Sequence, residues 1–447
     1  MRSQACLSLL LLISTTALHA AAKNDAVTFR RDVLPILQQN CQSCHRPGEI
    51  GPMPLLTYEQ VRPWAKAIRE SILTKRMPPW FADPAHGQFA NDRTLSQATI
   101  DTLVKWADTG TPEGDIADAP KPREFAEGWR IGEPDVVFEM PEEFHVPASG
   151  TVEYQWIMIP TGFTEDKWVQ AAEFRPGNPE VVHHSSVYTR EPDSSYARSY
   201  PMAEFFVLKG DGSSTPRLPR KGRTMFSAPD HPLHLQVWAP GGDPPQLPKG
   251  QARLVKAGSD IIFLMHYTAT GKAATDRSRI GLVFAKNPPQ QRVKTVRVQN
   301  GRPILIPPGE ANYNLESRVV LQKDLSIVSL QPHMHFRGKS FEYSVLYPNG
   351  SSEVLLRVPK YDFHWQLSYY LKETKQLPKG TTLIVKAGWD NSANNEDNPD
   401  PSATVKGGDQ SWDEMMAGFM EVAFEPETSQ DFFLDAPVEV STAQARN

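Results

Sequence analysis

The hydrophobic pattern divides the chain into a short helical part and a long β part. Within residues 29–40, apolar side chains recur at the three- and four-residue spacing of one helix face. Residues 96–110 show the same period between Ser96, a residue suited to cap a helix, and Gly110, which is suited to end one. We therefore expect two amphipathic helices whose apolar faces cross.

Beyond residue 128 the pattern changes to short apolar runs that contain β-branched and aromatic residues and are separated by Pro and Gly. Such runs are typical of strands in β-sandwiches. The predicted fold is multidomain, with a small α-helical domain at residues 25–115 and two mainly-β sandwich domains at 129–298 and 299–440. The clearest runs are VEYQWIMI (152–159), DIIFLMHYT (260–268), LSIVSL (325–330), FEYSVLY (341–347) and TTLIVKAGW (381–389).

Composition supports several soluble domains and excludes one class of partner. A chain of 447 residues exceeds one ordinary core, and its hydrophobic (39%) and charged (22%) fractions fit globular domains. The net charge of −5 comes without a long basic run, so we expect no nucleic-acid partner. Residues 116–128, rich in Pro, Asp and Glu, are predicted to link the helical and β domains.

The N-terminus has the pattern of a secretory signal peptide over residues 1–22, with Arg2, a short apolar run and small residues at its end. The run is too short to span a bilayer and no later stretch is apolar enough, so we expect a periplasmic or secreted protein without stable membrane insertion. Without Cys6, the mature chain keeps only Cys41 and Cys44, and disulfides cannot brace the β domains.

Cys41, Cys44 and His45 form the C-x-x-C-H motif of covalent haem c attachment. Thiols at this spacing add to the haem vinyl groups, and the following His lies under the iron as its proximal ligand. A redox dithiol does not need the His, and no second pair of cysteines completes a zinc site. With the two flanking helices, residues 25–115 resemble a class I cytochrome c.

The distal haem ligand has two main candidates, Met77 and Met53, and both precede Pro. We favour Met77, because Met53 follows His45 by only eight residues and leaves little chain to pass around the porphyrin. His86 is a third candidate that we expect on the surface. The sequence leaves the choice between the two methionines open.

Five histidines in strand-like segments indicate a metal. His333 and His335 flank a Met, and alternation in a strand sends both imidazoles to one face. His183 and His184 are adjacent, so they can share an ion only if the strand is twisted or bulged there. His266 stands alone in its run. One such histidine is usually structural, but five together in a body poor in cysteine favour metal binding.

The choice of metal depends on softer ligands. Met415, Met416 and Met420 lie close together near the C-terminus, and a thioether beside imidazoles selects copper over zinc or iron. Core packing is the simpler explanation for Met420. We also expect His364, which lies among aromatic residues, to be packed, and Arg337 to be a surface ion-pair partner.

The order of these motifs resembles the copper type II ascorbate-dependent monooxygenases, the family of peptidylglycine α-hydroxylating monooxygenase and dopamine β-monooxygenase. The likeness covers roughly residues 135–425 and rests on five short motifs in sequence. They are HH at 183–184, HY at 266–267, HxH at 333–335, RGK at 337–339 and DEM at 413–415.

This resemblance implies two jelly-roll sandwiches that face each other across a solvent-filled cleft and hold two copper ions. One copper stores and passes an electron, and its implied ligands are His183, His184 and His266. The other binds O2 and hydroxylates a substrate C–H bond, and its implied ligands, also the catalytic residues, are His333, His335 and Met415.

The chain departs from peptidylglycine hydroxylases where they bind the peptide carboxylate. The family uses an Arg and a Tyr, and the corresponding positions here are Gln331 and Phe419. A C-terminal glycine peptide is therefore a poor substrate candidate. A neutral or aromatic small molecule is easier to place beside Phe419.

The leading hypothesis is an exported copper-dependent monooxygenase that hydroxylates a small organic substrate with O2. Its one-electron donor is ascorbate or a redox protein, and the haem either relays electrons to the three-histidine copper or only senses redox state or docks a partner. The main rival is a non-enzymatic haem and copper protein that transfers electrons or handles copper. A zinc hydrolase is disfavoured, because no recognisable motif places a general-base carboxylate near His333.

Overall fold

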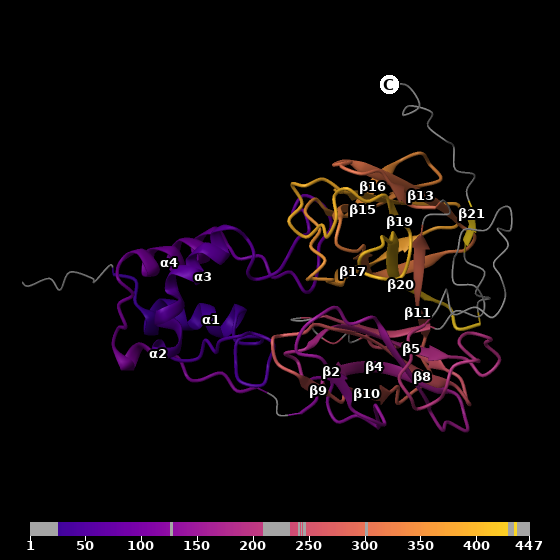
Figure 1. The fold of residues 1–447 in the computed structure, drawn as a ribbon, viewed down its shortest axis with the longest axis horizontal. Coiled ribbons are helices and arrows are strands. Elements are labelled where there is room, and N and C mark those ends of the chain that lie inside the picture. The colour runs from indigo at the N-terminus through magenta and orange to yellow at the C-terminus, as the bar shows by residue number, and fades with distance from the viewer. Residues whose placement is uncertain are drawn as a thin grey trace, which may run out of the picture.

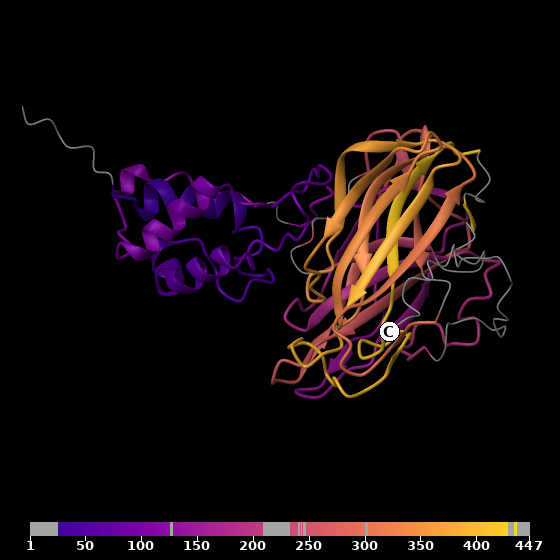
Figure 2. The ribbon, with the colours of Figure 1, turned by 90° about the horizontal axis from the view of Figure 1, so that it is seen from above.

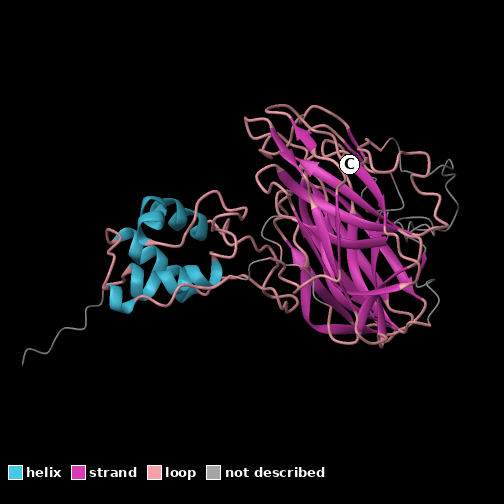
Figure 3. Cartoon of the chain, turned by 90° about the horizontal axis from the view of Figure 1, so that it is seen from below, coloured by secondary structure: helices cyan, strands magenta, loops and turns pink. Residues whose placement is uncertain are grey.

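The computed structural model describes residues 26–125, 128–208, 233–239, 242, 244, 247–299, 303–427 and 433–435. Its helices gather at one end of the molecule and its strands at the other (Figure 3). The strands form two stacked groups beside the helices (Figure 1). These parts are termed the helical module, the first β module (β1 to β10) and the second β module (β11 to β21). The predicted signal peptide, residues 1–22, lies outside the described residues.

The helical module contains both predicted helices. The first is a π-helical turn, Phe29–Val33, that continues into α1, and the second is α4, whose N-terminus is capped by the side chain of Ser96 as predicted. Among the described residues, no helix has the length and apolar character needed to cross a membrane. The α-helices are α1 (Leu34–Asn40), α2 (Tyr58–Val61), α3 (Ala65–Leu73) and α4 (Gln97–Asp108).

The apolar faces of these helices meet in a small core. Val33 and Leu37 of the first helix are fully buried, as are Leu103 and Trp106 of α4. The rings of Phe29 and Trp106 pack with their centroids 5.9 Å apart. The crossing predicted from the helical period is therefore confirmed.

In the part of the chain that the structure describes, the first β module contains ten strands in three sheets. β1, β10, β4 and β7 form half of an eight-stranded sheet, which is faced by a sheet of order β3-β8-β5-β6. The strands are β1 (Val136–Glu139), β2 (Phe144–Val146), β3 (Gln155–Pro160), β4 (Lys167–Arg175), β5 (Val182–Arg190), β6 (Leu233–Trp238), β7 (Gln251–Val255), β8 (Asp260–Tyr267), β9 (Ala274–Asp276) and β10 (Arg279–Phe284).

The second β module repeats this arrangement. β11, β20, β14 and β17 form the other half of the eight-stranded sheet, which is faced by a sheet of order β16-β15-β18-β13-β21. The strands are β11 (Gln291–Gln299), β12 (Leu305–Ile306), β13 (Tyr313–Leu321), β14 (Leu325–His333), β15 (Gly338–Leu346), β16 (Ser352–Val358), β17 (Tyr369–Leu377), β18 (Thr382–Trp389), β19 (Val405–Lys406), β20 (Ala417–Phe424) and β21 (Phe433–Asp435).

One continuous eight-stranded sheet joins the two β modules. Figure 2 shows these modules from above, beside the helical module. The halves of the sheet meet where β7 and β11 pair in parallel, with Gln251 opposite Gln291. A buried ion pair between Arg253 of β7 and Glu421 of β20 spans the same junction. Each module has its own apolar core. This architecture is mainly β and consistent with two sandwiches, and the exact boundary predicted at residue 299, the end of β11, stays a prediction.

Residues 80–92 leave the helical module and lie along β17 of the second β module. The N–H of Ala90 donates to the carbonyl of Tyr370 at 2.8 Å, and the N–H of Lys372 donates to the carbonyl of Gln88 at 2.9 Å. This docking segment therefore extends the edge of the eight-stranded sheet. The hydrophobic pattern of the sequence did not predict it.

Side chains reinforce the docking segment. The rings of Trp80 and Tyr369 pack with centroids 4.9 Å apart. Asn91 donates from its amide nitrogen to the carbonyl of Ser368 at 2.8 Å and accepts the N–H of Tyr370 at 3.0 Å. The helical module is thus fixed to the strand that follows residues 361–368 of the second β module.

We predict that Asn91→Ala loosens the docking segment. The substitution removes two hydrogen bonds, each of which contributes about 1 kcal/mol, so amide exchange at Tyr370 should accelerate at least roughly tenfold. Hydrogen exchange followed by mass spectrometry measures this. Asn349→Ala is the control, because Asn349 also accepts two hydrogen bonds, from Ser351, but in an exposed turn. Equal protection of Tyr370 in both variants would contradict the prediction.

Candidate metal centres

The first group of histidines, His183, His184 and His266, lies on two paired strands of the first β module. His183 and His184 are near the start of β5, and His266 is near the end of β8. In the β5–β8 ladder Val182 pairs with Tyr267 and His184 pairs with His266, so the register skips His183. This bulge is the irregularity that adjacent histidines need in order to face one ion.

The ring nitrogens of this group are spaced as the ligands of one ion. The Nδ1 atom of His184 is 3.0 Å from that of His183 and 3.2 Å from that of His266. Imidazole nitrogens that each lie about 2.0 Å from a shared ion are roughly 3 Å apart. The three residues therefore fit one metal ion held through Nδ1 atoms.

Burial keeps these imidazoles neutral. It lowers the pKa of His183 to about 4 and that of His266 to about 3. The pKa of His184 is lowered well below its usual value, first by burial and then by repulsion from His266 and His183. A neutral imidazole keeps the lone pair that a metal requires, so the group can bind a cation at neutral pH without displacing protons.

The second group of histidines lies at the end of β14. His333 is the last residue of the strand, and Met334 and His335 follow it. Met334 is fully buried in the core of the second β module, whereas both histidines line a cavity. The predicted alternation is therefore present, and the two ring centroids are 5.2 Å apart.

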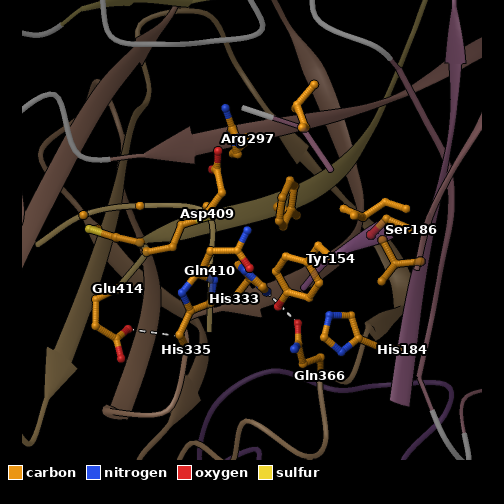
Figure 4. A pocket seen from close by; sticks show the side chains of 18 of the residues that line it. Tyr154, His184, Ser186, Arg297, His333, His335, Gln366, Asp409, Gln410 and Glu414 are labelled. Carbon is orange, nitrogen blue, oxygen red and sulfur yellow. Dashed lines mark hydrogen bonds between the residues drawn. The ribbon is translucent and has the colours of Figure 1, made fainter. Parts of the chain in front are cut away.

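Hydrogen bonds determine which nitrogen each of these rings presents. His333 Nδ1 is 2.5 Å from Gln366 Oε1 (Figure 4), and His335 Nδ1 is 3.3 Å from the carbonyl of Asp413. An amide or carbonyl oxygen can only accept, so each Nδ1 carries the proton and each Nε2 keeps its lone pair. The second group thus offers Nε2 atoms, whereas the first offers Nδ1 atoms.

Glu414 fixes the position of His335. Its carboxylate accepts the backbone N–H of His335 at 3.0 Å, the backbone N–H of Arg337 at 2.7 Å and the indole N–H of Trp389 at 2.9 Å. Burial raises the pKa of Glu414 to about 7, although these donors favour its charged form. The sequence reasoning missed this role, and the only available signal was the place of Glu414 beside Met415.

Arg337 contributes to the same support, and the expectation that it lies on the surface is wrong. It is only 2% exposed. Its guanidinium donates to Asn391 Oδ1 at 2.8 Å and to the carbonyl of Trp412 at 2.9 Å. Arg337 therefore ties the segment after His335 to the segment before Glu414.

Both groups of histidines reach one cavity of about 330 Å³. Figure 4 shows His184 approaching it from one side and His333 and His335 from the other. Gln331 and Phe419 also line it, and the ring of Phe419 packs edge-on against His333 at 6.0 Å. The wall further includes Met415, Tyr154, Trp156, Tyr188 and Leu264. His184 of the first group, both histidines of the second group and several aromatic side chains therefore share one space, which Arg297 and Asp409 also line.

The C-x-x-C-H motif faces the first β module. His45 Nδ1 is 3.2 Å from the carbonyl of Met53, which leaves Nε2 as the donor that an iron would need. Burial raises the pKa of the Cys41 thiol to about 12. Cys44 lines a cavity of about 270 Å³ together with Trp238 of the first β module. Two thiols and a following imidazole are the donors that a covalent haem would need. Haem attachment stays a prediction, as does the choice of Met77 over Met53.

The three histidines of the first group lie close enough to share one ion, and Met415 lines the same cavity as His333 and His335. Imidazole and thioether side chains are ligands that copper accepts. Residues 295–430 match the family model of the copper type II ascorbate-dependent monooxygenase, C-terminal domain. The matched region contains His333, His335 and Met415. The match supports the family that the sequence motifs indicated and suggests copper-dependent monooxygenase activity.

Other comparisons add no functional information. No curated protein matches the chain. Among solved structures, the chain is similar to the VP2 protein of infectious bursal disease virus in T=1 particles, with 10% identity, a TM-score of 0.18 and coverage of 66% of this chain and 70% of that chain. A VP2 subviral particle of the same virus gives 8% identity, a TM-score of 0.19 and coverage of 66% and 72%. Scores this low support no conclusion about fold or function.

We predict that Gln366→Leu weakens the second metal centre. Without the hydrogen bond to Gln366, the ring of His333 can turn. Loss of such a supporting group typically lowers metal affinity by roughly 10- to 100-fold. Competition titration of copper against a chelator measures the affinity. Gln322→Leu, elsewhere in the same β module, is the control. Equal affinity in the two variants would show that Gln366 does not orient His333.

Proposed function

We propose that the protein is a copper-dependent monooxygenase that hydroxylates a C–H bond of a small organic substrate with O2. The observation that carries the proposal is the shared cavity, on which His184 and the second group of histidines both open. The family match over residues 295–430 supports it independently. Bound copper would supply one-electron chemistry and O2 activation.

The proposed ligands divide the two roles between the β modules. His183, His184 and His266 would hold the copper that stores an electron. The copper at which the substrate reacts would be held by His333, His335 and Met415. The hydrogen bonds of Gln366 and Glu414 keep the second set in place before any metal arrives, so little reorganisation accompanies binding.

The cavity wall favours a neutral or aromatic substrate. Gln331 and Phe419 stand where related enzymes bind a peptide carboxylate, and neither can form an ion pair with one. Phe419 instead offers a ring beside His333, and Trp156 and Tyr188 extend the aromatic surface. Aromatic side chains bind planar apolar groups through stacking and burial.

We further propose that the protein is exported and that residues 25–115 form a cytochrome c-like domain with one covalent haem c. Haem held by Cys41, Cys44 and His45 would supply a one-electron carrier. Cys44 and Trp238 line the same small cavity, and Trp238 pairs with Ser185, the residue after His184. This short connection supports a relay of electrons from the haem to the three-histidine copper.

We predict that the loaded protein binds two coppers and incorporates one oxygen atom from labelled O2 into its product. His333→Ala should lose one copper and all hydroxylation, whereas His183→Ala should lose the other copper and keep the methionine-ligated one. Metal analysis and mass spectrometry measure these outcomes. Stoichiometric copper without any oxygen incorporation across a broad substrate screen would favour the non-enzymatic electron-transfer or copper-handling alternative.

We also predict that prereduced haem is oxidised by the copper sites at least as fast as turnover. Stopped-flow absorbance of the haem measures this step. The oxidation should fail in His266→Ala and persist in His145→Ala, whose histidine is exposed on β2. Haem that stays reduced through many turnovers, while ascorbate alone sustains hydroxylation, would exclude the relay and leave redox sensing or partner docking.

A further inference from the structure

The second β module contributes a loop to the first group of histidines. This loop lies between β16 and β17 and contains Phe363 and His364. The ring centroid of Phe363 is 5.7 Å from that of His183 and 6.2 Å from that of His266. A loop of the second β module therefore covers the candidate site of the first β module.

His364 is the next residue of this loop, and its ring lies 5.8 Å from that of His183 in an edge-on arrangement. The expectation that His364 is packed among aromatic residues is wrong, because its side chain is 52% exposed. Packing does not explain its place beside His183.

Asp362 prepares the ring of His364 to act as a ligand. The carboxylate oxygen Oδ1 lies 3.1 Å from His364 Nδ1 and accepts the backbone N–H of His364 at 2.9 Å. With its proton held on Nδ1 by a carboxylate, a neutral imidazole presents a lone pair on Nε2. A carboxylate bonded to the outer nitrogen is the usual support of a metal-bound histidine.

We propose that His364 is a fourth ligand of the metal centre formed by His183, His184 and His266, and that it binds through Nε2. The inference rests on the proposed copper function. Cu(II) favours four nitrogen or oxygen ligands in a tetragonal arrangement, and three histidines leave one of these positions to water or to another side chain. His364 would displace that water, and a ring that was protonated would release its Nε2 proton on binding.

This assignment makes the oxidised metal a crosslink between the two β modules. Three ligands come from β5 and β8, and the fourth comes from a loop that also carries Gln366, the partner of His333. Cu(I) accepts lower coordination numbers, so the His364 bond would stabilise the oxidised state selectively. Loss of this ligand should therefore raise the reduction potential of the site.

The test uses the full chain with His335→Ala, so that added Cu(II) occupies only the three-histidine centre. X-ray absorption at the copper edge counts imidazole ligands without interference from haem iron. We expect four imidazoles in this background and three after His364→Ala, together with a Cu(II) dissociation constant at least about tenfold higher. Asp362→Asn should keep the ring and lie between the two in affinity.

His86→Ala is the matched control, because His86 is also partly exposed beside an aspartate, Asp83. It should retain four imidazoles. Thermal unfolding of the metal-free His364→Ala variant should match the parent, which separates ligand loss from misfolding. Three imidazoles before and after His364→Ala would overturn the inference and leave the proposed function intact. Failure of His183→Ala to reduce copper binding would instead overturn the proposed metal centre itself.

Discussion

The eight-stranded sheet that runs through both β modules is the constraint on which the candidate centres depend. Its halves meet where β7 and β11 pair in parallel, and the buried ion pair of Arg253 and Glu421 spans that junction. Neighbouring strands in a sheet keep a fixed spacing, so the pairing of β7 with β11 fixes the position of one β module relative to the other. The facing sheets then bring β5 and β8 of the first module close to the end of β14 in the second.

Buried polar residues concentrate where the modules support the second group of histidines. Glu414 and Arg337 are almost inaccessible, and burying such groups costs free energy unless each finds partners. Both find several, and three of these partners are backbone groups, those of His335, Arg337 and Trp412. These hydrogen bonds offset the free-energy cost of burying the two side chains. They also fix the path of the backbone, which makes the loop rigid. Such rigidity suits a metal centre, whose ligands must be held within a few tenths of an ångström.

The sequence could predict what depends on local periodicity. The two crossing helices, the strand runs and the shared face of His333 and His335 follow from periods of 3.6 and 2, and the structure contains them. The sequence indicated that a shared ion would need a bulge at His183. It could not show that the bulge exists, because a bulge depends on the pairing with β8. That Cys41, Cys44 and His45 hold haem stays a prediction.

Contacts between distant segments were beyond such reasoning. Gln366 lies 33 residues from His333, and its role depends on how the loop before β17 folds back. The docking segment is further still, since Asn91 bonds Ser368 across 277 residues. No periodic signal marks such pairs, because they depend on how distant segments of the chain fold back on each other. His364 was misjudged for the same reason: its aromatic sequence neighbours do not surround it in space.

The ring of Phe363 gives the two groups of histidines a physical connection. Its centroid is 6.0 Å from that of His184 and 6.0 Å from that of His335, so one side chain contacts both. The loop that carries this ring also carries Gln366 and is followed by the strand to which the docking segment is bonded. A displacement of the helical module would therefore change both the orientation of His333 and the position of the Phe363 ring between the two groups of histidines. Conversely, metal ligands that fix this loop would strengthen the seating of the helical module, because coupling between two sites is reciprocal.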